Sequence, residues 1–331
     1  MYRLAIDSQF LPHDEDLFFW IAPFTSRSGT ENIFLSVVKE EFLNEAFFQQ
    51  TRAFPFNKKV SAPLPEETSK EEYLDSVNAV LKDIRSNNIK KAVLSRAFTV
   101  NKPHDFDPLD CFARLTADYP QTFVHLCYHP KSGMWMGATP ELLLRKRNAL
   151  LSAMALAGTQ ARRAEGDYHW REKEEEEQEM VSVHIETVFK KYGYTLVEKE
   201  GPQTAESGRV AHLKTDYIYH ENARIPLRDL LAELHPTPAV GGLPVDKGMD
   251  CILENEGYDR RYYCGFIGET DFSQTADLYI NLRCMQVGEE KIAIYAGAGI
   301  TGASDPQEEW EETVLKSKTM IEKIKPVKEL Y

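Results

Sequence analysis

Hydrophobic positions in the segment after residue 67 repeat every three or four residues, which is the spacing of one face of an α-helix. The pattern opens at Thr68-Ser69 and closes at Asn87-Asn88. Its apolar members are Tyr73, Val77, Val80, Leu81 and Ile84. The chain predicts further helices over residues 107–118, 168–192, 226–233, 245–256 and 305–323.

Residues 90–100 instead alternate as a β-strand does. Other strands are predicted over residues 17–22, 122–129, 134–137, 141–144, 151–156, 262–270, 276–286 and 291–296, with two or three more between residues 194 and 219. We expect turns at residues 157–159 and 297–302. The strands come in groups rather than in strict βαβ alternation, which predicts an α+β fold, an α/β sandwich with large, mostly antiparallel sheets and helices packed outside. We expect residues 1–331 to form a single domain.

Composition indicates a globular protein and argues against one class of ligand. The chain has 331 residues, 42% hydrophobic and 27% charged, so it is long enough to bury a substantial core. Its formal net charge of −13 argues against nucleic-acid binding, which needs a basic footprint. An anionic substrate stays possible, because it needs only a locally positive pocket.

Cysteine usage and hydropathy indicate the compartment. The five cysteines are far apart and form no Cys-x-x-Cys motif, which is typical of reduced thiols: Cys111, Cys127, Cys251, Cys264 and Cys284. We see no signal peptide and no run of about 20 apolar residues. We therefore expect a cytoplasmic protein that does not bind membranes, and a monomer because no heptad pattern is present.

Two pairs of glutamates suggest metal chemistry. Glu309 and Glu312 lie three apart on a predicted helix, so both carboxylates project from one face, with Lys316 a turn further along. Glu174 and Glu177 repeat this spacing on the predicted acidic helix. Oxygen ligands of this kind suit a hard cation such as Mg²⁺. Solvated acidic helix faces are the alternative, and spacing does not select the ligands within the run of glutamates at 172–179.

Three further residues carry candidate chemistry. Lys91, at the start of a predicted strand, can act as a base if burial or a neighbouring positive charge lowers its pKa; otherwise it is a surface lysine. Glu141 follows a Thr-Pro turn and can act as an acid if desolvation raises its pKa; otherwise it is a loop glutamate. Arg283 is a charge in an apolar strand and needs a carboxylate partner, from a substrate or from the protein. His212 and His235 lie in apolar sequence, where packed histidines are common.

Several short motifs follow one another along the chain. They are Lys91-Ala-Val-Leu-Ser-Arg96, Gly137-Ala-Thr-Pro-Glu141, Leu156-Ala-Gly-Thr159, Ala211-His-Leu213, Leu234-His-Pro-Thr-Pro-Ala239, Ala296-Gly-Ala-Gly-Ile300 and Glu309-Trp-Glu-Glu-Thr313. This ordered set resembles the chorismate-utilising enzymes, and isochorismate synthases in particular. The resemblance covers roughly residues 65–325, the family's catalytic region, whereas residues 1–60 carry little of it and look shorter than is usual.

The resemblance implies a chorismate-binding catalytic domain and a Mg²⁺-dependent addition of water. Lys91 matches the general base that activates water for attack at C2, and Glu141 the general acid that protonates the departing C4 hydroxyl. The metal-site positions match Glu174, Glu177, Glu309 and Glu312, although Gln178 stands where relatives often have His. The substrate-binding positions match Gly158, Thr159, His235, Arg283, Gly299 and Lys316.

The resemblance also bears on the subclass. Relatives that add ammonia usually have Gln at position 91 and need a glutaminase subunit, which we do not expect here. Relatives with a covalent lysine have it where this chain has Ala157. Water is then the expected nucleophile, and isochorismate synthase the expected activity. Salicylate synthase, which also eliminates pyruvate, is the alternative; the segment around His235 favours the former. A silent chorismate-binding protein is a third hypothesis. The product's pathway, to menaquinone or to siderophores, is left open.

Overall fold

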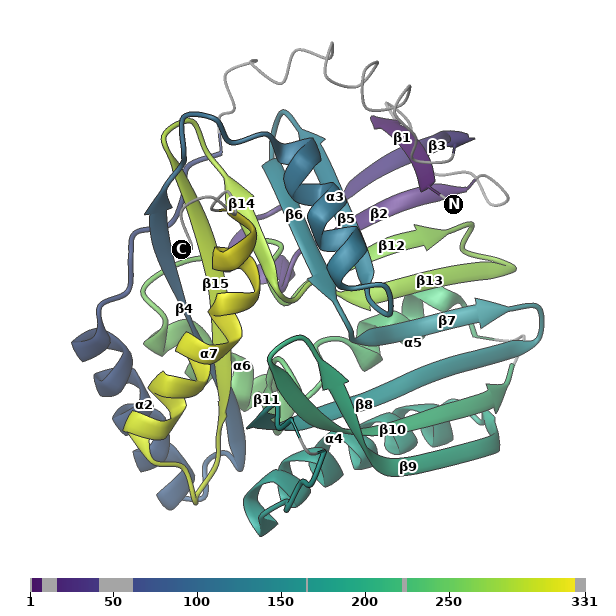
Figure 1. Cartoon of the computed structure of the whole chain (residues 1–331). Helices are drawn as coiled ribbons and strands as arrows, with labels where there is room; N and C mark the ends of the chain where they lie inside the picture. Colours follow the sequence, from purple (N-terminus) through teal and green to yellow (C-terminus); the bar gives the residue numbers. More distant parts are fainter. Residues whose placement is uncertain (1, 8–16, 42–61, 165, 222–224, 325–331) are drawn as a thin grey trace.

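Two mostly separate antiparallel sheets organise the computed structural model, which describes residues 2–7, 17–41, 62–164, 166–221 and 225–324. Within those residues, one sheet has nine strands in the order β1-β3-β2-β12-β13-β7-β8-β10-β9, and the other has six in the order β11-β4-β15-β14-β6-β5 (Figure 1). Every strand pair among the described residues is antiparallel.

The larger sheet collects strands from the whole length of the chain. Its strands are β1 (Tyr2–Asp7), β2 (Phe18–Ala22), β3 (Ile33–Glu41), β7 (Leu142–Arg147), β8 (Leu150–Ala161), β9 (Thr195–Ser207), β10 (Val210–His220), β12 (Phe266–Thr270) and β13 (Thr275–Ile280). The smaller sheet comprises β4 (Lys91–Asn101), β5 (Phe123–His129), β6 (Gly133–Thr139), β11 (Gly242–Leu243), β14 (Cys284–Val287) and β15 (Lys291–Ile300).

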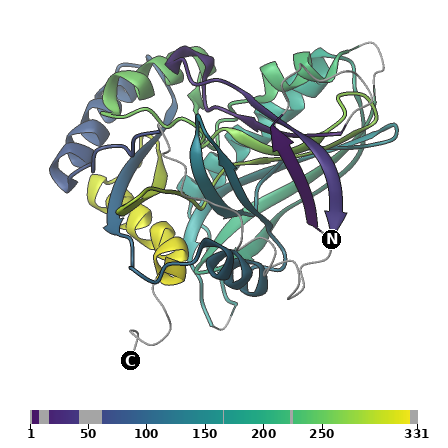
Figure 2. The same cartoon turned by 90° about the horizontal axis from the view of Figure 1, so that it is seen from above.

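Helices pack outside both sheets. They are η1 (Ser26–Ser28), α2 (Lys70–Arg85), α3 (Pro108–Asp118), α4 (Glu172–Lys191), α5 (Leu227–Leu234), α6 (Val245–Asn255) and α7 (Pro306–Ile324). α4 packs on β8 and β10 of the larger sheet, whereas α7 packs on β15 and lies beside α2 (Figure 2). No helix of the described residues combines the length and the apolar character needed to cross a bilayer.

Local sequence explains where helices begin. Ser69 caps α2 through a reciprocal capping box with Glu72, which satisfies donors that a helix end leaves free. Asp107 caps α3 by accepting from the backbone of Leu109, ahead of Pro108 in the first turn. The helices therefore begin within about four residues of their predicted starts, and the α+β prediction is confirmed. Part of the segment 1–60 lies outside the described residues, so the single-domain prediction stays a prediction.

One predicted strand, over residues 276–286, is wrong. The chain runs along β13 in the larger sheet, crosses over at residues 281–283, and continues as β14 in the smaller sheet. Arg283 adopts a positive φ of 47° at this crossover. The apolar residues on both sides are buried whichever sheet they join, so their pattern does not reveal the switch.

Two predicted turns are also wrong where their glycines lie inside strands, although Gly302 does lie in a turn after β15. β15 continues to Ile300, and its Gly297 and Gly299 pair with Ser95 and Val93. β8 continues to Ala161, with Gly158 as the additional residue of a bulge opposite β10. These glycines permit close approach of other groups rather than a reversal of the chain.

A buried ion pair between Glu256 and Arg260 links β4 to the segments that follow α5 and α6. Glu256 accepts from Arg260 at 2.5 Å and from the Ser95 amide at 2.6 Å, and Arg260 donates to the carbonyls of Val93 and Val240. Both charged side chains are less than 5% exposed. Removing one charge would leave the other buried without a partner.

We therefore expect Glu256→Gln to lower the free energy of unfolding by about 3–5 kcal/mol. Urea denaturation followed by circular dichroism measures this as a lower midpoint. Glu31→Gln is the matched control, because the Glu31–Lys131 pair is exposed on both sides, and its midpoint should stay close to that of the unmodified protein. Equal shifts in the two variants would contradict the role given to burial.

Candidate active site

A pocket lies where the two sheets face each other. The smaller sheet contributes β4 and β15, the larger contributes β8 and β10, and α4 and α7 each add a charged side chain. Its lining includes Val93, Glu141, Ala157, Gly158, Thr159, Glu177, His212, Tyr263, Cys264, Arg283, Gly297, Gly299 and Lys316. Residues distant in sequence thus converge on one cavity, as in most enzyme sites.

Two crossovers between the sheets place a carboxyl group and a guanidinium group in this pocket. Glu141 lies between β6 and β7, and Arg283 between β13 and β14. The crossovers are hydrogen-bonded side by side: Ile280 N donates to the Glu141 carbonyl at 3.0 Å, and Ala138 N to the Arg283 carbonyl at 3.1 Å. These backbone hydrogen bonds therefore fix the positions of the main chain at Glu141 and Arg283, from which both side chains extend.

Burial changes the proton affinity of Glu141. The side chain is 3% exposed, and desolvation raises its pKa to about 8 despite the opposing effects of Lys91, Lys316 and Arg283. A carboxyl group in that state carries its proton at neutral pH. Glu141 can therefore donate a proton. An ordinary loop glutamate would not be buried in this way.

His212 holds Arg283 from behind. Its Nδ1 lies 2.9 Å from the Gly158 carbonyl, which can only accept, so Nδ1 carries the proton. Nε2 then accepts from Arg283 Nη2 at 3.1 Å. Burial, followed by the charges of Arg283 and Lys316, keeps the pKa of His212 well below its ordinary value, so the ring is neutral. The sequence indicated only a packed histidine here; its charged neighbour was not visible in the pattern.

Gly158 brings β8 close to α4. Its φ is 68°, and a Cβ at this position would lie 3.0 Å from the Cβ and from the carbonyl oxygen of Glu174. A side chain here would force helix and strand apart. Thr159, the next residue, places its hydroxyl 3.3 Å from His212 Nδ1.

Lys91 is wholly buried and faces Glu177. Its Nζ lies 2.9 Å from Glu177 Oε1, and Glu177 lines the pocket. Gly299 makes this arrangement possible: a Cβ there would lie 2.1 Å from Glu177 Oε1 and 3.1 Å from Lys91 Cε. The surface-lysine alternative for Lys91 is therefore wrong.

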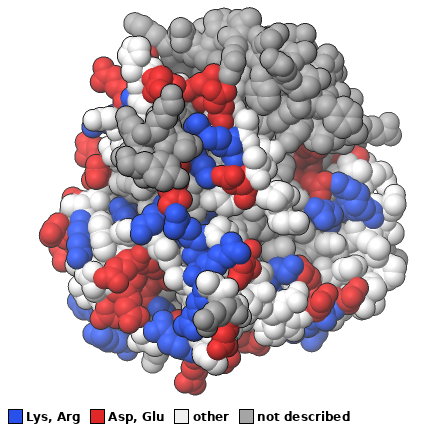
Figure 3. All heavy atoms as spheres, viewed as in Figure 1, with Lys and Arg blue, Asp and Glu red and all other residues white. Residues whose placement is uncertain are grey.

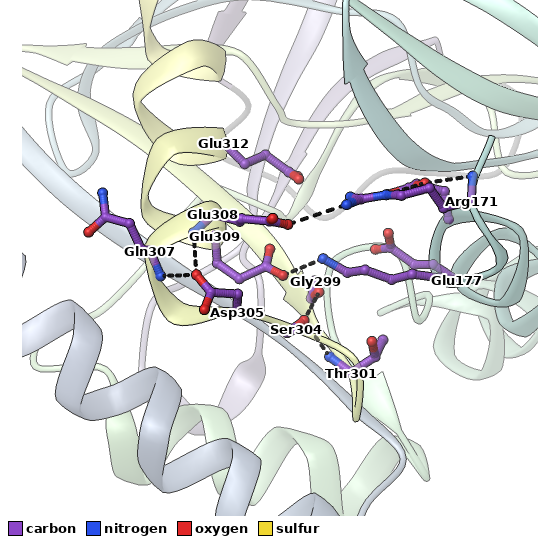
Figure 4. Close-up of polar contacts among 12 residues, drawn as sticks. Arg171, Glu177, Gly299, Thr301, Ser304, Asp305, Gln307, Glu308, Glu309 and Glu312 are labelled. Carbon is purple, nitrogen blue, oxygen red and sulfur yellow. Dashed lines mark hydrogen bonds and ion pairs between the residues drawn. The ribbon is translucent and has the colours of Figure 1, made fainter. Parts of the chain in front are cut away.

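Glu177 from α4 lies on one side of the site, and Glu309 and Glu312 from α7 lie on the facing side (Figure 4). Each predicted glutamate contacts a basic side chain: Glu174 contacts Arg171 at 2.6 Å, Glu177 contacts Lys91, Glu309 contacts Lys173, and Glu312 contacts Lys316 at 2.6 Å. Burial and then the charge of Glu312 raise the pKa of Glu309 to about 7. The solvated-face alternative does not fit these buried or half-buried carboxylates.

Five predicted site residues lie outside the pocket lining: Lys91, Glu174, His235, Glu309 and Glu312. Glu174 turns back to the start of α4, where its carboxylate accepts from the Arg171 amide at 2.9 Å. His235 Nε2 bonds the Cys264 carbonyl at 2.9 Å, so it supports the pocket wall from behind. Burial lowers its pKa to about 4. Gln178, where relatives often have His, is buried and donates to Ser182 and Thr215.

Tyr263 also lines the pocket, and nothing in the sequence pattern singled it out. It stacks on Tyr295, with ring centroids 5.3 Å apart. A Cβ on Gly297 would lie 3.1 Å from its hydroxyl. The repeated glycines of β15 were the signal that could have indicated a residue such as Tyr263, because glycines in a strand mark a surface that other side chains approach closely.

Comparisons with known proteins show the family to which this chain belongs. Residues 18–325 match the family described as chorismate binding enzyme. The isochorismate synthase EntC of Escherichia coli strain K12 is 30% identical over 280 residues, which cover 82% of this chain and 71% of that protein. The vibriobactin-specific isochorismate synthase of Vibrio cholerae is 28% identical, with 93% and 79% covered. The crystal structure of DhbC from Bacillus anthracis superposes with a TM-score of 0.78 at 25% identity, with 93% and 83% covered. The chain therefore belongs to the chorismate binding enzyme family.

Proposed function

We propose that this protein is an isochorismate synthase, an isomerase that converts chorismate to isochorismate. The observation that carries the proposal is a buried carboxyl group that stays protonated at neutral pH, Glu141, in a pocket that also contains Arg283 and Lys316. The relatives named as isochorismate synthases support the same activity.

The pocket suits a dianionic substrate although the chain is acidic. Arg283 and Lys316 supply fixed positive charge, and Lys316 is held by the Gly297 carbonyl at 3.0 Å. On the face seen in Figure 3, Lys and Arg side chains gather toward the middle, among areas of Asp and Glu. We assign the substrate carboxylates to Arg283 and Lys316, with Gly158, Thr159 and Gly299 forming the adjoining walls and His235 supporting them.

The reaction needs one base and one acid at different carbons. Lys91 takes a proton from water as the water oxygen bonds to C2, the two conjugated ring double bonds shift, and the C4–oxygen bond breaks. Glu141 gives its proton to the departing hydroxyl, which leaves as water. The reaction conserves all atoms and requires no oxidant or reductant. Ala157 lines the pocket, so no amine is available there to replace water as the nucleophile.

Mg²⁺ fits the carboxylates between α4 and α7. Oxygen donors suit this ion, and the raised pKa of Glu309 beside Glu312 marks a carboxylate pair that a cation would stabilise. We assign Glu177, Glu309 and Glu312 to the metal, with Glu174 beside them. Among the described residues, no three such ligands are already gathered. When bound, the ion would offset the negative charge of the substrate.

Chromatography of the products formed from chorismate tests the proposed activity. We expect isochorismate alone, formed with Mg²⁺ and lost with a chelator. Salicylate together with pyruvate would contradict the proposal in favour of salicylate synthase. Chorismate binding without any product would contradict the enzymatic role altogether.

Gly299→Ala provides a test of the site geometry. The added methyl group overlaps Glu177 and crowds Lys91, so we expect kcat/KM for chorismate to fall by at least about tenfold. Gly302→Ala is the matched control, because its nearest neighbour, Ile84, would lie 3.8 Å away. Similar kinetics for the two variants would contradict the assigned geometry.

A further inference from the structure

Arg96 joins the strand that carries Lys91 to the helix that carries Glu309, Glu312 and Lys316. Lys91 and Arg96 are five residues apart on β4, so their side chains leave opposite faces of the strand. Lys91 meets Glu177 on one face, and Arg96 meets α7 on the other. The motif around residues 91–96 thus contains both the proposed base and a residue that the proposed reaction does not use.

The contacts of Arg96 are directional. Its Nε donates to Thr313 Oγ1 at 2.7 Å, and its guanidinium lies 4.0 Å from the ring centroid of Trp310. Trp310 is flanked by Tyr73 of α2, with ring centroids 5.8 Å apart. Arg96 is 6% exposed, and among the described residues it takes part in no ion pair with a carboxylate. A buried cation held mainly by a hydroxyl and aromatic faces is costly, and those contacts form in only a narrow range of positions.

These contacts fix both the rotation of α7 about its axis and its position along that axis. Trp310 and Thr313 are interleaved along one stretch of helix with Glu309 and Glu312. A helix turns about 100° and rises about 1.5 Å per residue, so holding two of these side chains sets the direction of the others. Lys316, one turn beyond Glu312, reaches the Gly297 carbonyl from the same helix.

From this geometry we infer that Arg96 is a positioning residue, which sets α7 so that its two carboxylates and Lys316 face the site. The inference rests on the proposed function for the roles of those side chains. Arg96 does not touch substrate or metal; it acts through Trp310 and Thr313. The Arg-Trp-Thr contact explains why residues of two separate sequence motifs meet outside the pocket.

The test compares Thr313→Val and Arg96→Met with Thr319→Val. Thr319 lies on the same helix, is 3% exposed, and its hydroxyl has no hydrogen-bond partner among the described residues. We expect Thr313→Val and Arg96→Met to weaken Mg²⁺ binding by at least about threefold in calorimetry and to lower kcat/KM about tenfold or more. Thr319→Val should match the unmodified protein in both. The double variant Arg96→Met/Thr313→Val should lose little more than Arg96→Met alone, because the two residues share one contact.

Arg96→Lys separates geometry from charge. Lysine keeps the positive charge but lacks the planar group that stacks on Trp310 and the Nε donor, so it should not rescue Mg²⁺ affinity. Unmodified Mg²⁺ affinity and kcat/KM in Arg96→Met, with or without a lower melting temperature, would overturn the inference, as would full rescue by lysine. If the unmodified protein binds Mg²⁺ but makes no isochorismate, the proposed function fails while the calorimetric comparison still tests the role of Arg96.

Discussion

Lys91→Met is expected to reduce kcat for chorismate conversion by about 10²–10⁴-fold, the usual contribution of a positioned base. Methionine has nearly the length of lysine and fills the same buried space, but it has no amine to take a proton from water. Lys91 is wholly buried, and its Nζ lies 2.9 Å from Glu177. Lys316 and Lys173 also act electrostatically on Glu177, so the carboxylate keeps cationic neighbours in the variant.

The control for Lys91→Met is the neighbouring residue. Lys90 is exposed, so Lys90→Met makes the same substitution one position away and should leave the kinetics unchanged. Steady-state kinetics and a melting curve of each variant are the measurements. Lys91→Met with kcat within a few-fold of the unmodified protein would exclude Lys91 as the base. Equal losses in the two variants would indicate a general effect of charge.

Local signals in the sequence were sufficient for most of the fold. The helix beginning at Lys70 has a capping residue, an apolar face and a closing turn, all within 20 residues, and the structure has the helix as predicted. The errors lie where non-local packing decides. The sequence predicts one strand over residues 276–286, because a strand buried in either sheet has the same kind of apolar residues. Gly297 and Gly299 read as a turn, because their actual role depends on Tyr263, Glu177 and Lys91, which are distant in sequence.

The site was predicted by family resemblance rather than by pattern alone. Local spacing places Glu309, Glu312 and Lys316 on one helix, but it cannot say that Lys91 from β4 faces Glu177 from α4. His212 was not predicted as a site residue, because its function depends on Arg283, 71 residues away. Glu174 shows the reverse case: its spacing from Glu177 is that of a ligand pair, yet in the structure its carboxylate accepts from the Arg171 amide at the start of its own helix.

Glu141→Gln is expected to lower kcat by about 10²–10⁴-fold, because glutamine cannot protonate the departing hydroxyl. The pH dependence follows from the pKa of about 8 that burial gives Glu141. Only the protonated form donates, so kcat/KM of the unmodified protein should fall about tenfold per pH unit above pH 8. A bound dianion disfavours ionisation of Glu141 further, so the decline of kcat should begin at a higher pH than that of kcat/KM. Glu175→Gln, on the exposed side of α4, is the control.

Glu141→Gln should lower activity but raise the stability of the folded protein at high pH. The pKa of Glu141 is about 8 in the folded protein and near 4.5 in the unfolded chain, so folding takes up a proton between these values. Its contribution to stability is therefore greatest below pH 4.5 and declines as pH rises to 8. Glu141→Gln carries no such charge, so at pH 9 it should be more stable than the unmodified protein, by on the order of a few kcal/mol. A variant that is inactive and also less stable at pH 9 would indicate that Glu141 is a structural residue. Loss of activity with gain of stability is the combination that a desolvated catalytic acid requires.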